Sequence, residues 1–545
     1  MMGSQATKGI DKVKIVKMRA TYLKHTLESV ERIITLIDRN PFSPTYGCID
    51  RSYWQYKTID YSAGTSQLGS LLLALVYKTN FPGNIYYRNE RIKELAIAGI
   101  NFLRKNAHSD GTSDDYYPFE RALGATSFSL YGCSEAYIVL EHKDKEIERF
   151  FRKVADWMLN NNEPGKISNH QFVAAVALTN VYKITGDNKY LDEAKKRVNT
   201  GLSWMSDEGW FYEYEGCDPG YLTFSIDFLA KYYKKTQDKK IIPVVKKAVE
   251  FASYFIHPDG SYGGVYGSRN TTHFLPHGLE VFGKEIPLAT QITDLFLEGM
   301  RNGMEERMND DRYFIFDYDF IQAYIDFNEA RKGKIERHEF EKYFPEAKIL
   351  IKKHGFYYIV VSMAKGGVCS IFRGSQNVYN DAGLIGTTKK GDMIVTQMMD
   401  EQNKIEMSNN MAKVEGPFNK AGTMLQSQFK FLLFRGFSFT IGRSNFFSHI
   451  MKKYLTKFLI LKKKRVPVKF ERTFEFGSRI KITDIITIKG DVEIKRLAIG
   501  PDHTSIYIPT SRYYQKNLSL GKWIYLDSYL EELNRNKTVK IQRLV

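Results

Sequence analysis

Residues 166–187 read KISNHQFVAAVALTNVYKITGD, and this stretch decides the fold that we expect. From Phe172 onward, apolar and small residues recur at the spacing of a buried helix. Ser168, Asn169 and His170 stand immediately before that run. Ser168 or Asn169 would serve well as a helix N-cap, whereas an Asn-His pair at a helix start also suits a polar site. Neighbouring stretches of sequence bear on this choice.

Helical spacing of apolar residues continues on both sides of this stretch, with short turns between segments. The helices we expect cover 21–38, 62–79, 90–106, 125–140, 145–160, 171–185, 189–204, 222–235, 241–256, 286–303 and 314–331. Three of the loops share an acidic or Gly turn followed by aromatic residues: 109–119, 207–216 and 258–267. This weak repeat predicts a ring of helical hairpins with one class of loops gathered at one mouth. A solenoid of HEAT or TPR type is the alternative, but the repeat is too irregular for either.

After Pro345 the pattern changes to short β-rich runs broken by Gly, Asn or Asp. The expected strands lie in 356–367, 368–375, 392–399, 430–443, 468–477, 479–490 and 491–500. We therefore predict a multidomain α and β protein. An N-terminal (α/α) toroid, an incomplete α/α barrel, covers 1–330, a charged linker covers 331–345 and an antiparallel β-sandwich covers 346–545.

The four cysteines are scattered without a CxxC pair, which indicates neither a disulfide framework nor a zinc site. No window is long and apolar enough to span a membrane. The first 20 residues contain no apolar signal region, so the sequence as it stands predicts a cytoplasmic protein. A periplasmic or secreted location follows if a signal has been removed. The oligomeric state stays open.

The positive charge is concentrated in the second domain. From Glu346 to Val545 there are 34 Lys and Arg against 16 Asp and Glu, whereas the first 345 residues hold 45 and 46. Such a domain attracts polyanions, although solubility alone is the alternative explanation. The basic run 451–472 suits glycan binding, peripheral attachment to a membrane, or a solvated strand edge. No nucleic-acid module is recognised, so nucleic acid is not expected as a partner.

Two further stretches carry candidate site residues. Tyr221 stands at a loop–helix junction, 51 residues after His170, one helical hairpin further round a toroid. The Gly-rich segment 263–280 holds Arg269, His273 and His277, and Arg269 suits a carboxylate or sulfate. His273 and His277 are four apart, but Pro276 argues against metal ligation on a regular helix, so no metal or cofactor is expected. In aromatic-rich surroundings, three more residues are substrate-binding candidates: Trp54, Tyr117 and Arg121.

Together these features resemble the heparinase II/III-like and alginate-lyase-like polysaccharide lyases. The resemblance covers the architecture of nearly the whole chain, and in motifs it rests on Asn169-His170 and Tyr221. It implies β-elimination on a uronate-containing acidic polysaccharide. In that scheme Asn169 neutralises the uronate carboxylate, with Arg269 or His273 as a second group, and Tyr221 is the acid and in one version also the base. His170 is the alternative base or a second neutralising group.

One feature departs from the resemblance, because several members carry a His on an early sandwich strand. The corresponding region here, 366–386, has none and offers Asn380 or Asp381 instead.

Two other functions remain open. An inverting glycoside hydrolase would need two carboxylates, for which the candidates are Asp60, Glu120, Asp218 and Glu280. A non-catalytic protein that binds an acidic glycan is the other alternative.

Overall fold

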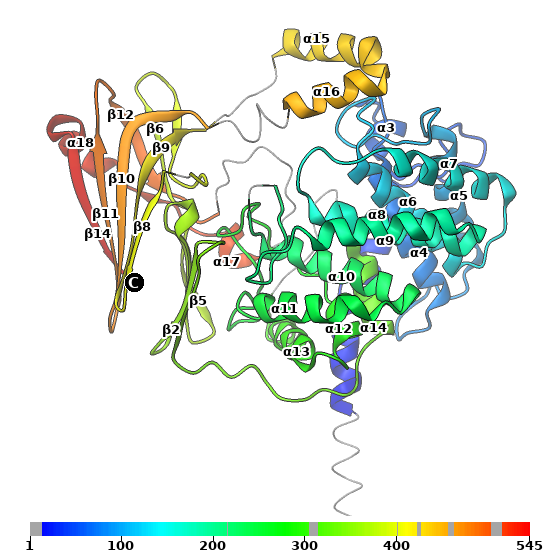
Figure 1. Ribbon diagram of the computed structural model, residues 1–545, viewed down its shortest axis with the longest axis horizontal. Helices are drawn as coiled ribbons and strands as arrows, with labels where there is room; N and C mark the ends of the chain where they lie inside the picture. The colour runs from blue at the N-terminus through cyan, green and yellow to red at the C-terminus, as the bar shows by residue number, and fades with distance from the viewer. Residues whose placement is uncertain are drawn as a thin grey trace, which may run out of the picture.

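The computed structural model describes residues 13–214, 216–304, 314–400, 402–421, 427–455, 463–502 and 515–545. The described part confirms the expected fold class: a helical half stands beside an antiparallel β half (Figure 1). The helices are α2 (Thr26–Leu36), α3 (Arg51–Trp54), α4 (Gly69–Lys78), α5 (Glu90–Asn106), α6 (Leu123–Val139), α7 (Lys145–Asn160), α8 (Ser168–Thr185), α9 (Asn188–Leu202), α10 (Pro219–Thr236), α11 (Ile242–Ala252), α12 (His277–Phe282), α13 (Pro287–Arg301) and α14 (Tyr318–Ile325).

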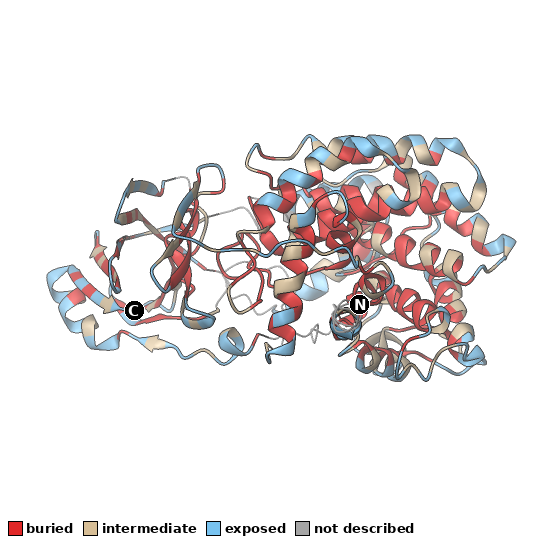
Figure 2. Cartoon of the chain, turned by 90° about the horizontal axis from the view of Figure 1, so that it is seen from below, coloured by how far each residue is buried: buried red, intermediate tan, exposed pale blue. Residues whose placement is uncertain are grey.

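Composition separates the inner helices of the toroid from the outer ones. Helices α4, α6, α8 and α10 are rich in apolar and small residues, and most of their positions are buried. Helices α5, α7, α9 and α11 bury one stripe and expose a charged face. Figure 2 shows the same contrast, with buried residues filling the inner helices and exposed ones on the outer face.

The weak sequence repeat has a structural counterpart. In each of the three loops a backbone N–H bonds to the carbonyl four residues on, from His108, Ser206 and His257. Each turn contains a glycine at positive φ that packs against the following outer helix. The three glycines are Gly111, Gly209 and Gly260. Because these loops lead into the inner helices α6, α10 and α12, they lie at one mouth of the toroid, as expected.

The β half consists of two antiparallel sheets. A five-stranded sheet has the order β1-β2-β3-β4-β5, and a nine-stranded sheet has the order β13-β12-β6-β7-β9-β10-β11-β14, with β8 paired to β9. The strands are β1 (Phe340–Phe344), β2 (Ile349–His354), β3 (Tyr357–Ser362), β4 (Val368–Arg373), β5 (Gln376–Asp381), β6 (Leu384–Thr388), β7 (Met393–Val395), β8 (Lys404–Ser408), β9 (Met411–Lys420), β10 (Arg465–Phe476), β11 (Ile480–Ile488), β12 (Ile494–Ile499), β13 (Ile524–Tyr525) and β14 (Thr538–Leu544). Short helices α17 (Lys516–Ser519) and α18 (Leu530–Asn536) accompany them.

The central strands β2, β3 and β4 of the five-stranded sheet are buried on both faces, whereas the edge strands β1 and β5 are partly exposed. Leu350 and Ile359 belong to the core shared with the larger sheet, whereas their neighbours Ile351 and Val360 pack into the core of the toroid. This alternation follows from the strand period of two. All residues of β3 are buried, so this sheet joins the two halves of the molecule.

Two segments differ from the sequence-based expectation. Residues 430–443, expected as a strand, belong to the helix α15 (Gln428–Phe439) and a short turn, and α16 (Asn445–Leu455) follows. Its apolar residues form a continuous run at 431–434 and then alternate at 437, 439 and 441, so their period did not distinguish strand from helix. The expected linker 331–345 contains β1, which pairs with β2. Residues 456–462 of the basic run lie outside the described residues. Among the helices in the described ranges, none is long and apolar enough to cross a membrane.

A buried ion network stabilises the sandwich. Arg472 is fully buried, and its guanidinium bonds to Asp484 through Nε at 2.6 Å and to Asp381 through Nη1 at 2.9 Å. Arg543 donates to Asp484 at 2.6 Å. Buried charges are tolerated when paired, but removing one partner leaves the others uncompensated.

We expect Arg472→Ala to lower the free energy of unfolding by about 3–5 kcal/mol, because Asp381 and Asp484 lose their main counter-charge. Chemical denaturation followed by circular dichroism measures this. Arg496→Ala is the matched control, since the pair that Arg496 forms with Asp527 is exposed and is worth less than about 1 kcal/mol. Equal losses in the two variants would contradict the structural role of the network.

Candidate active site

The sequence-based candidates Asn169, His170 and Tyr221 lie in the first turns of the inner helices α8 and α10. Ser168 and Asn169 do not cap α8, because its N-cap is Ile167, which makes no side-chain cap bond. Ser168 instead donates to the carbonyl of Tyr212 at 2.9 Å. The side chain of Asn169 is therefore available for another partner.

That partner is Glu213, which sequence reasoning missed. Asn169 donates to the Glu213 carboxylate from its backbone at 2.9 Å and from Nδ2 at 2.7 Å. Burial raises the pKa of Glu213 to about 8, although the bonds from Asn169 lower it. At neutral pH this carboxyl is therefore mostly protonated. Its place in the aromatic loop 207–216, which we had already singled out, was the available signal.

Asp218 links the start of α10 to the Gly-rich loop. Its carboxylate accepts the backbone N–H of Tyr221 at 3.1 Å as the N-cap of α10. It also accepts the backbone N–H of Arg269 at 2.8 Å and the hydroxyl of Thr271. Burial raises the pKa of Asp218 above its ordinary value despite these bonds. One carboxyl group thus fixes Tyr221 and Arg269 relative to each other.

Arg269 is 2% exposed, and its guanidinium carbon lies 4.3 Å from the centroid of the Tyr214 ring. Among the residues that the structure describes, its Nε and Nη2 have no hydrogen-bond partner. A buried cation with unused donors is costly unless it has a ligand. Arg269 is therefore poised to bind an anion.

Aromatic contacts connect the remaining candidates. The His273 ring lies 5.1 Å from the Tyr221 ring and 4.9 Å from Phe224. Phe128 in turn lies 6.4 Å from Phe224 and 6.1 Å from His170. We define the rim cluster by six residues: Asn169, His170, Glu213, Tyr221, Arg269 and His273.

His170 is oriented by a residue pair that reaches across to the β half. Its Nδ1 lies 3.3 Å from Glu163, and Lys452 on α16 lies 2.5 Å from the same carboxylate. Burial raises the pKa of Glu163, but Lys452 and His170 outweigh it and hold that pKa well below its usual range. Glu163 therefore stays ionised beside His170.

Lys365, just after β3, was also missed and holds the loop that carries Arg269. It is 1% exposed, and its ammonium donates to the carbonyls of Val265 at 2.7 Å and Gly267 at 2.8 Å, and to the side chain of Asn270. A lysine within the apolar run 356–367 was the available signal. The sandwich thus contributes a positioning residue.

Three predicted substrate-binding residues have their contacts outside the rim cluster. Trp54 donates Nε1 to the carbonyl of Leu36, and Arg121 lies 3.5 Å from Asp110. Tyr117 contacts Phe434 of α15 at 5.2 Å between ring centroids. Tyr117 therefore packs against α15, and none of the three contacts the rim cluster in the interactions above.

His277, expected to bind substrate, belongs instead to a buried charge cluster. Its ring nitrogens bond to Asp227 at 2.7 Å and Asp326 at 2.9 Å. Burial and Lys231 lower its pKa, but these two hydrogen bonds outweigh them and raise it. Asp227, His277 and Asp319 have the spacing of metal ligands, but the Lys231 ammonium already donates to both aspartates and lies 3.1 Å from Nδ1 of His277. The cluster is thus satisfied by a side chain.

The carboxylates considered for a hydrolase each have a structural partner. Arg331 binds both oxygens of Glu280 at 2.6 and 2.7 Å, and Arg435 binds Asp60 at 3.1 Å. Glu120 accepts the backbone N–H groups of Asp115 and Tyr116. Asp381, sought as a sandwich contribution to the site, is buried in the Arg472 network.

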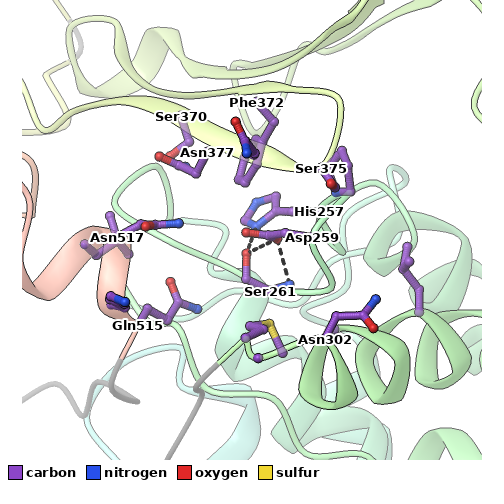
Figure 3. A pocket seen from close by; sticks show the side chains of 18 of the residues that line it. His257, Asp259, Ser261, Asn302, Ser370, Phe372, Ser375, Asn377, Gln515 and Asn517 are labelled. Atoms are coloured by element: carbon purple, nitrogen blue, oxygen red, sulfur yellow. Dashed lines mark hydrogen bonds between the residues drawn. The ribbon is translucent and has the colours of Figure 1, made fainter.

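A cavity of about 610 Å³ lies between the toroid and the sandwich, beside the loop 257–263 (Figure 3). His257, Asp259 and Ser261 of the toroid line it, facing strands β4 and β5 and the helix α17. Nine of its 21 lining residues carry an amide or a hydroxyl. Its charged residues are Asp259, Glu298 and Lys516, so it does not suit an anionic group.

The raised pKa of Glu213 makes stability depend on pH. The folded protein holds a proton up to about pH 8 that the unfolded chain releases near the ordinary value of 4.5. The free energy of unfolding therefore falls as pH rises from about 5 to 8. Glu213→Gln keeps a neutral group, so we expect it to remove a part of this fall, on the order of a few kcal/mol.

Unfolding transitions at pH 5 and pH 8 measure the difference between the two proteins. Other buried carboxyls titrate in both proteins, so their contributions to the pH dependence of unfolding cancel when the two proteins are compared. Glu532→Gln, on the exposed face of α18, is the matched control. Parallel pH profiles for wild type and Glu213→Gln would refute a proton held at Glu213.

Residues 87–274 match the family model described as the Ulvan lyase N-terminal domain. The match contains every residue of the rim cluster. No curated protein sequence matches the chain.

Among solved structures, the chondroitin AC lyase of Streptomyces coelicolor A3, in complex with chondroitin sulphate, matches with a TM-score of 0.55 at 10% identity, over 90% of this chain and 71% of that one. Heparinase III matches with a TM-score of 0.49 at 10% identity, over 81% of this chain and 64% of that one. An unsaturated glucuronyl hydrolase mutant from Streptococcus agalactiae matches with a TM-score of 0.40 at 13% identity, over 58% of this chain and 91% of that one. The chain thus spans 64% of the length of heparinase III.

This chain shares with the chondroitin AC lyase a helical toroid followed by antiparallel sheets. The Ulvan lyase N-terminal domain lies within that toroid. Residues 87–274 thus resemble an Ulvan lyase N-terminal domain, and the likeness to the chondroitin AC lyase is one of fold.

Proposed function

We propose that this protein cleaves a uronate-containing acidic polysaccharide by β-elimination at the rim cluster. The observation that carries the proposal is Arg269, a buried guanidinium whose Nε and Nη2 have no partner among the described residues. It lies in the loop that Asp218 ties to Tyr221. A planar guanidinium binds a carboxylate through two parallel hydrogen bonds.

The first requirement of β-elimination is neutralisation of the uronate carboxylate. The proton on C5 becomes acidic when the negative charge that develops on the carboxylate is stabilised by fixed donors. Arg269 and the Asn169 amide are the donors in this scheme. The N-terminal ends of α8 and α10 add favourable partial charge for an anion.

Glu213 supports this scheme through its protonation state. An ionised carboxylate beside Asn169 would repel the uronate. Because burial raises the pKa of Glu213 to about 8, the group is mostly neutral at pH 7 and does not oppose the substrate charge. Its hydrogen bonds with Asn169 keep the amide in position.

The second requirement is transfer of two protons. A base removes the C5 proton, the C4–O bond breaks, a C4=C5 double bond forms, and an acid protonates the departing glycosidic oxygen. Tyr221 is the acid in our proposal, and either Tyr221 or His170 is the base. Glu163 orients His170, and His273 packs against the Tyr221 ring.

The distribution of charge favours a polyanionic substrate. The segment 346–545 carries the whole positive excess, so its field would draw an acidic chain toward the mouth. The hydrolase alternative lacks comparable support, because Asp60, Glu120 and Glu280 are engaged as described above.

A screen of acidic polysaccharides tests the proposal, and it begins with ulvan and chondroitin sulphate, the polysaccharides that the comparisons name.

The test is a screen of acidic polysaccharides that follows the ultraviolet absorbance of the unsaturated product. We expect turnover by the wild type, and a fall in kcat of about a hundredfold or more for Tyr221→Phe. Arg269→Met removes the carboxylate donor and should lower kcat/KM by a similar factor. His170→Ala distinguishes the two candidate bases. Tyr254→Phe is the matched control, since Tyr254 contacts β1 and not the rim cluster.

Three outcomes would overturn the proposal. Turnover that survives both Tyr221→Phe and Arg269→Met would remove the rim cluster as the site. Cleavage without an unsaturated product would favour the hydrolase. Binding without turnover by the wild type, unchanged in Tyr221→Phe, would favour a non-catalytic glycan-binding protein.

A further inference from the structure

The helices α15 and α16, with the turn between them, form a helical hairpin that covers residues 427–455. The hairpin is inserted between β9 and β10, yet it lies over the toroid and not on the sandwich (Figure 1). Figure 1 places it at the edge of the molecule, above α3.

The inner face of the hairpin is attached to the toroid. Phe434 contacts Tyr117, and the Ser448 hydroxyl donates to the carbonyl of Phe119 at 2.8 Å. Lys452 pairs with Glu163 on the same side. These contacts fix which face of each helix points outward.

The outer face is apolar. On α15, Phe429, Leu432 and Leu433 are 71%, 67% and 60% exposed, and their spacing places them on one side of the helix. On α16, Phe446 and Ile450 are 67% and 47% exposed and are also four apart. Large contiguous apolar surfaces on soluble proteins mark interaction sites. This face therefore needs an occupant.

The charge of the hairpin identifies the chemistry of that occupant. The sequence contains no Asp or Glu from residue 416 to residue 470. Exposed lysines accompany the apolar face: Lys430 and Lys453, with Lys464 just before β10. The occupant must then combine negative charge with an apolar interior.

Other occupants meet only part of this requirement. A second copy of the chain would bring two cationic surfaces together. A polysaccharide or a nucleic acid supplies negative charge, but neither buries aliphatic side chains such as Leu432 and Ile450. An anionic bilayer supplies both, since its headgroups bind lysine while its acyl boundary accepts Phe and Leu.

We propose that the helical hairpin docks this protein on an anionic phospholipid surface. Phe429, Leu432, Leu433, Phe446 and Ile450 enter the boundary between headgroups and acyl chains. Lys430 and Lys453 bind the headgroups. This inference does not depend on the reaction proposed for the rim cluster.

The test is co-sedimentation of the full chain with vesicles, without polysaccharide. We expect binding to phosphatidylcholine vesicles that contain phosphatidylglycerol, and weaker binding to vesicles of phosphatidylcholine alone. Leu432→Ser with Leu433→Ser should lower the partition coefficient about tenfold or more. Lys430→Gln and Lys453→Gln should each lower it about fivefold, and added salt should reduce that difference. Phe356→Ser is the matched control, because Phe356 is 77% exposed on the β2–β3 turn.

The result that would overturn the proposal is wild-type protein that stays in the supernatant with both kinds of vesicle. The proposal would also be overturned if the double variant Leu432→Ser, Leu433→Ser lost no more binding than Phe356→Ser does. A dimer in sedimentation velocity that the Leu variant dissociates, without vesicle binding, would assign the face to a second copy. Circular dichroism checks folding, and the exposed lysine variants carry the test if the Leu variant unfolds.

Discussion

Burial of the central strands β2, β3 and β4 of the five-stranded sheet on both faces is the constraint on which the rest of the structure depends. Successive residues of β2 and β3 point in turn into the toroid and into the larger sheet, so the two halves share this layer. β3 leads to Lys365, whose ammonium binds the carbonyls of Val265 and Gly267. The place of Arg269 therefore depends on a strand of the other domain. A shift of the sheet by one residue would exchange its two faces and remove this anchor.

The electrostatics of the rim follow from burial and not from the number of acidic residues. Glu213 and Asp218 lie close to Arg269, and two ionised carboxylates there would cancel the attraction for an anion. Desolvation raises the pKa of both groups, and for Glu213 it raises the pKa to about 8, so at neutral pH this carboxyl opposes the guanidinium little. Glu163 differs, because Lys452 and His170 keep it ionised beside the imidazole. Two glutamates at the same mouth thus differ in protonation at neutral pH, because Glu213 is mostly protonated and Glu163 is ionised.

The parts of the fold that sequence predicts well have a clear period. Helices α5 and α7 were expected over 90–106 and 145–160, which are the bounds observed, since an apolar stripe and caps at Asn89 and Asp144 define them. The run 430–443 was assigned to a strand because apolar residues alternate at 437, 439 and 441, and the apolar run 431–434 suits a strand as well as a helix. Glu213 and Lys365 were missed because their importance comes from partners distant in sequence. His277 was misplaced for the same reason, since Asp227 lies 50 residues away.

The missing sandwich His can now be interpreted. Asp381, in the region where a His was sought, is required by Arg472 inside the sandwich core. The β half reaches the mouth by other means, through Lys365 on the Arg269 loop and Lys452 on the pair that holds His170. Both lysines act on backbone or carboxylate groups of the toroid, so they position residues and do not need to exchange protons. All six residues of the rim cluster, in contrast, come from the toroid. In our proposal the toroid supplies the reacting groups, and the β half supplies orientation and charge. A sandwich without a His at that position is consistent with this division.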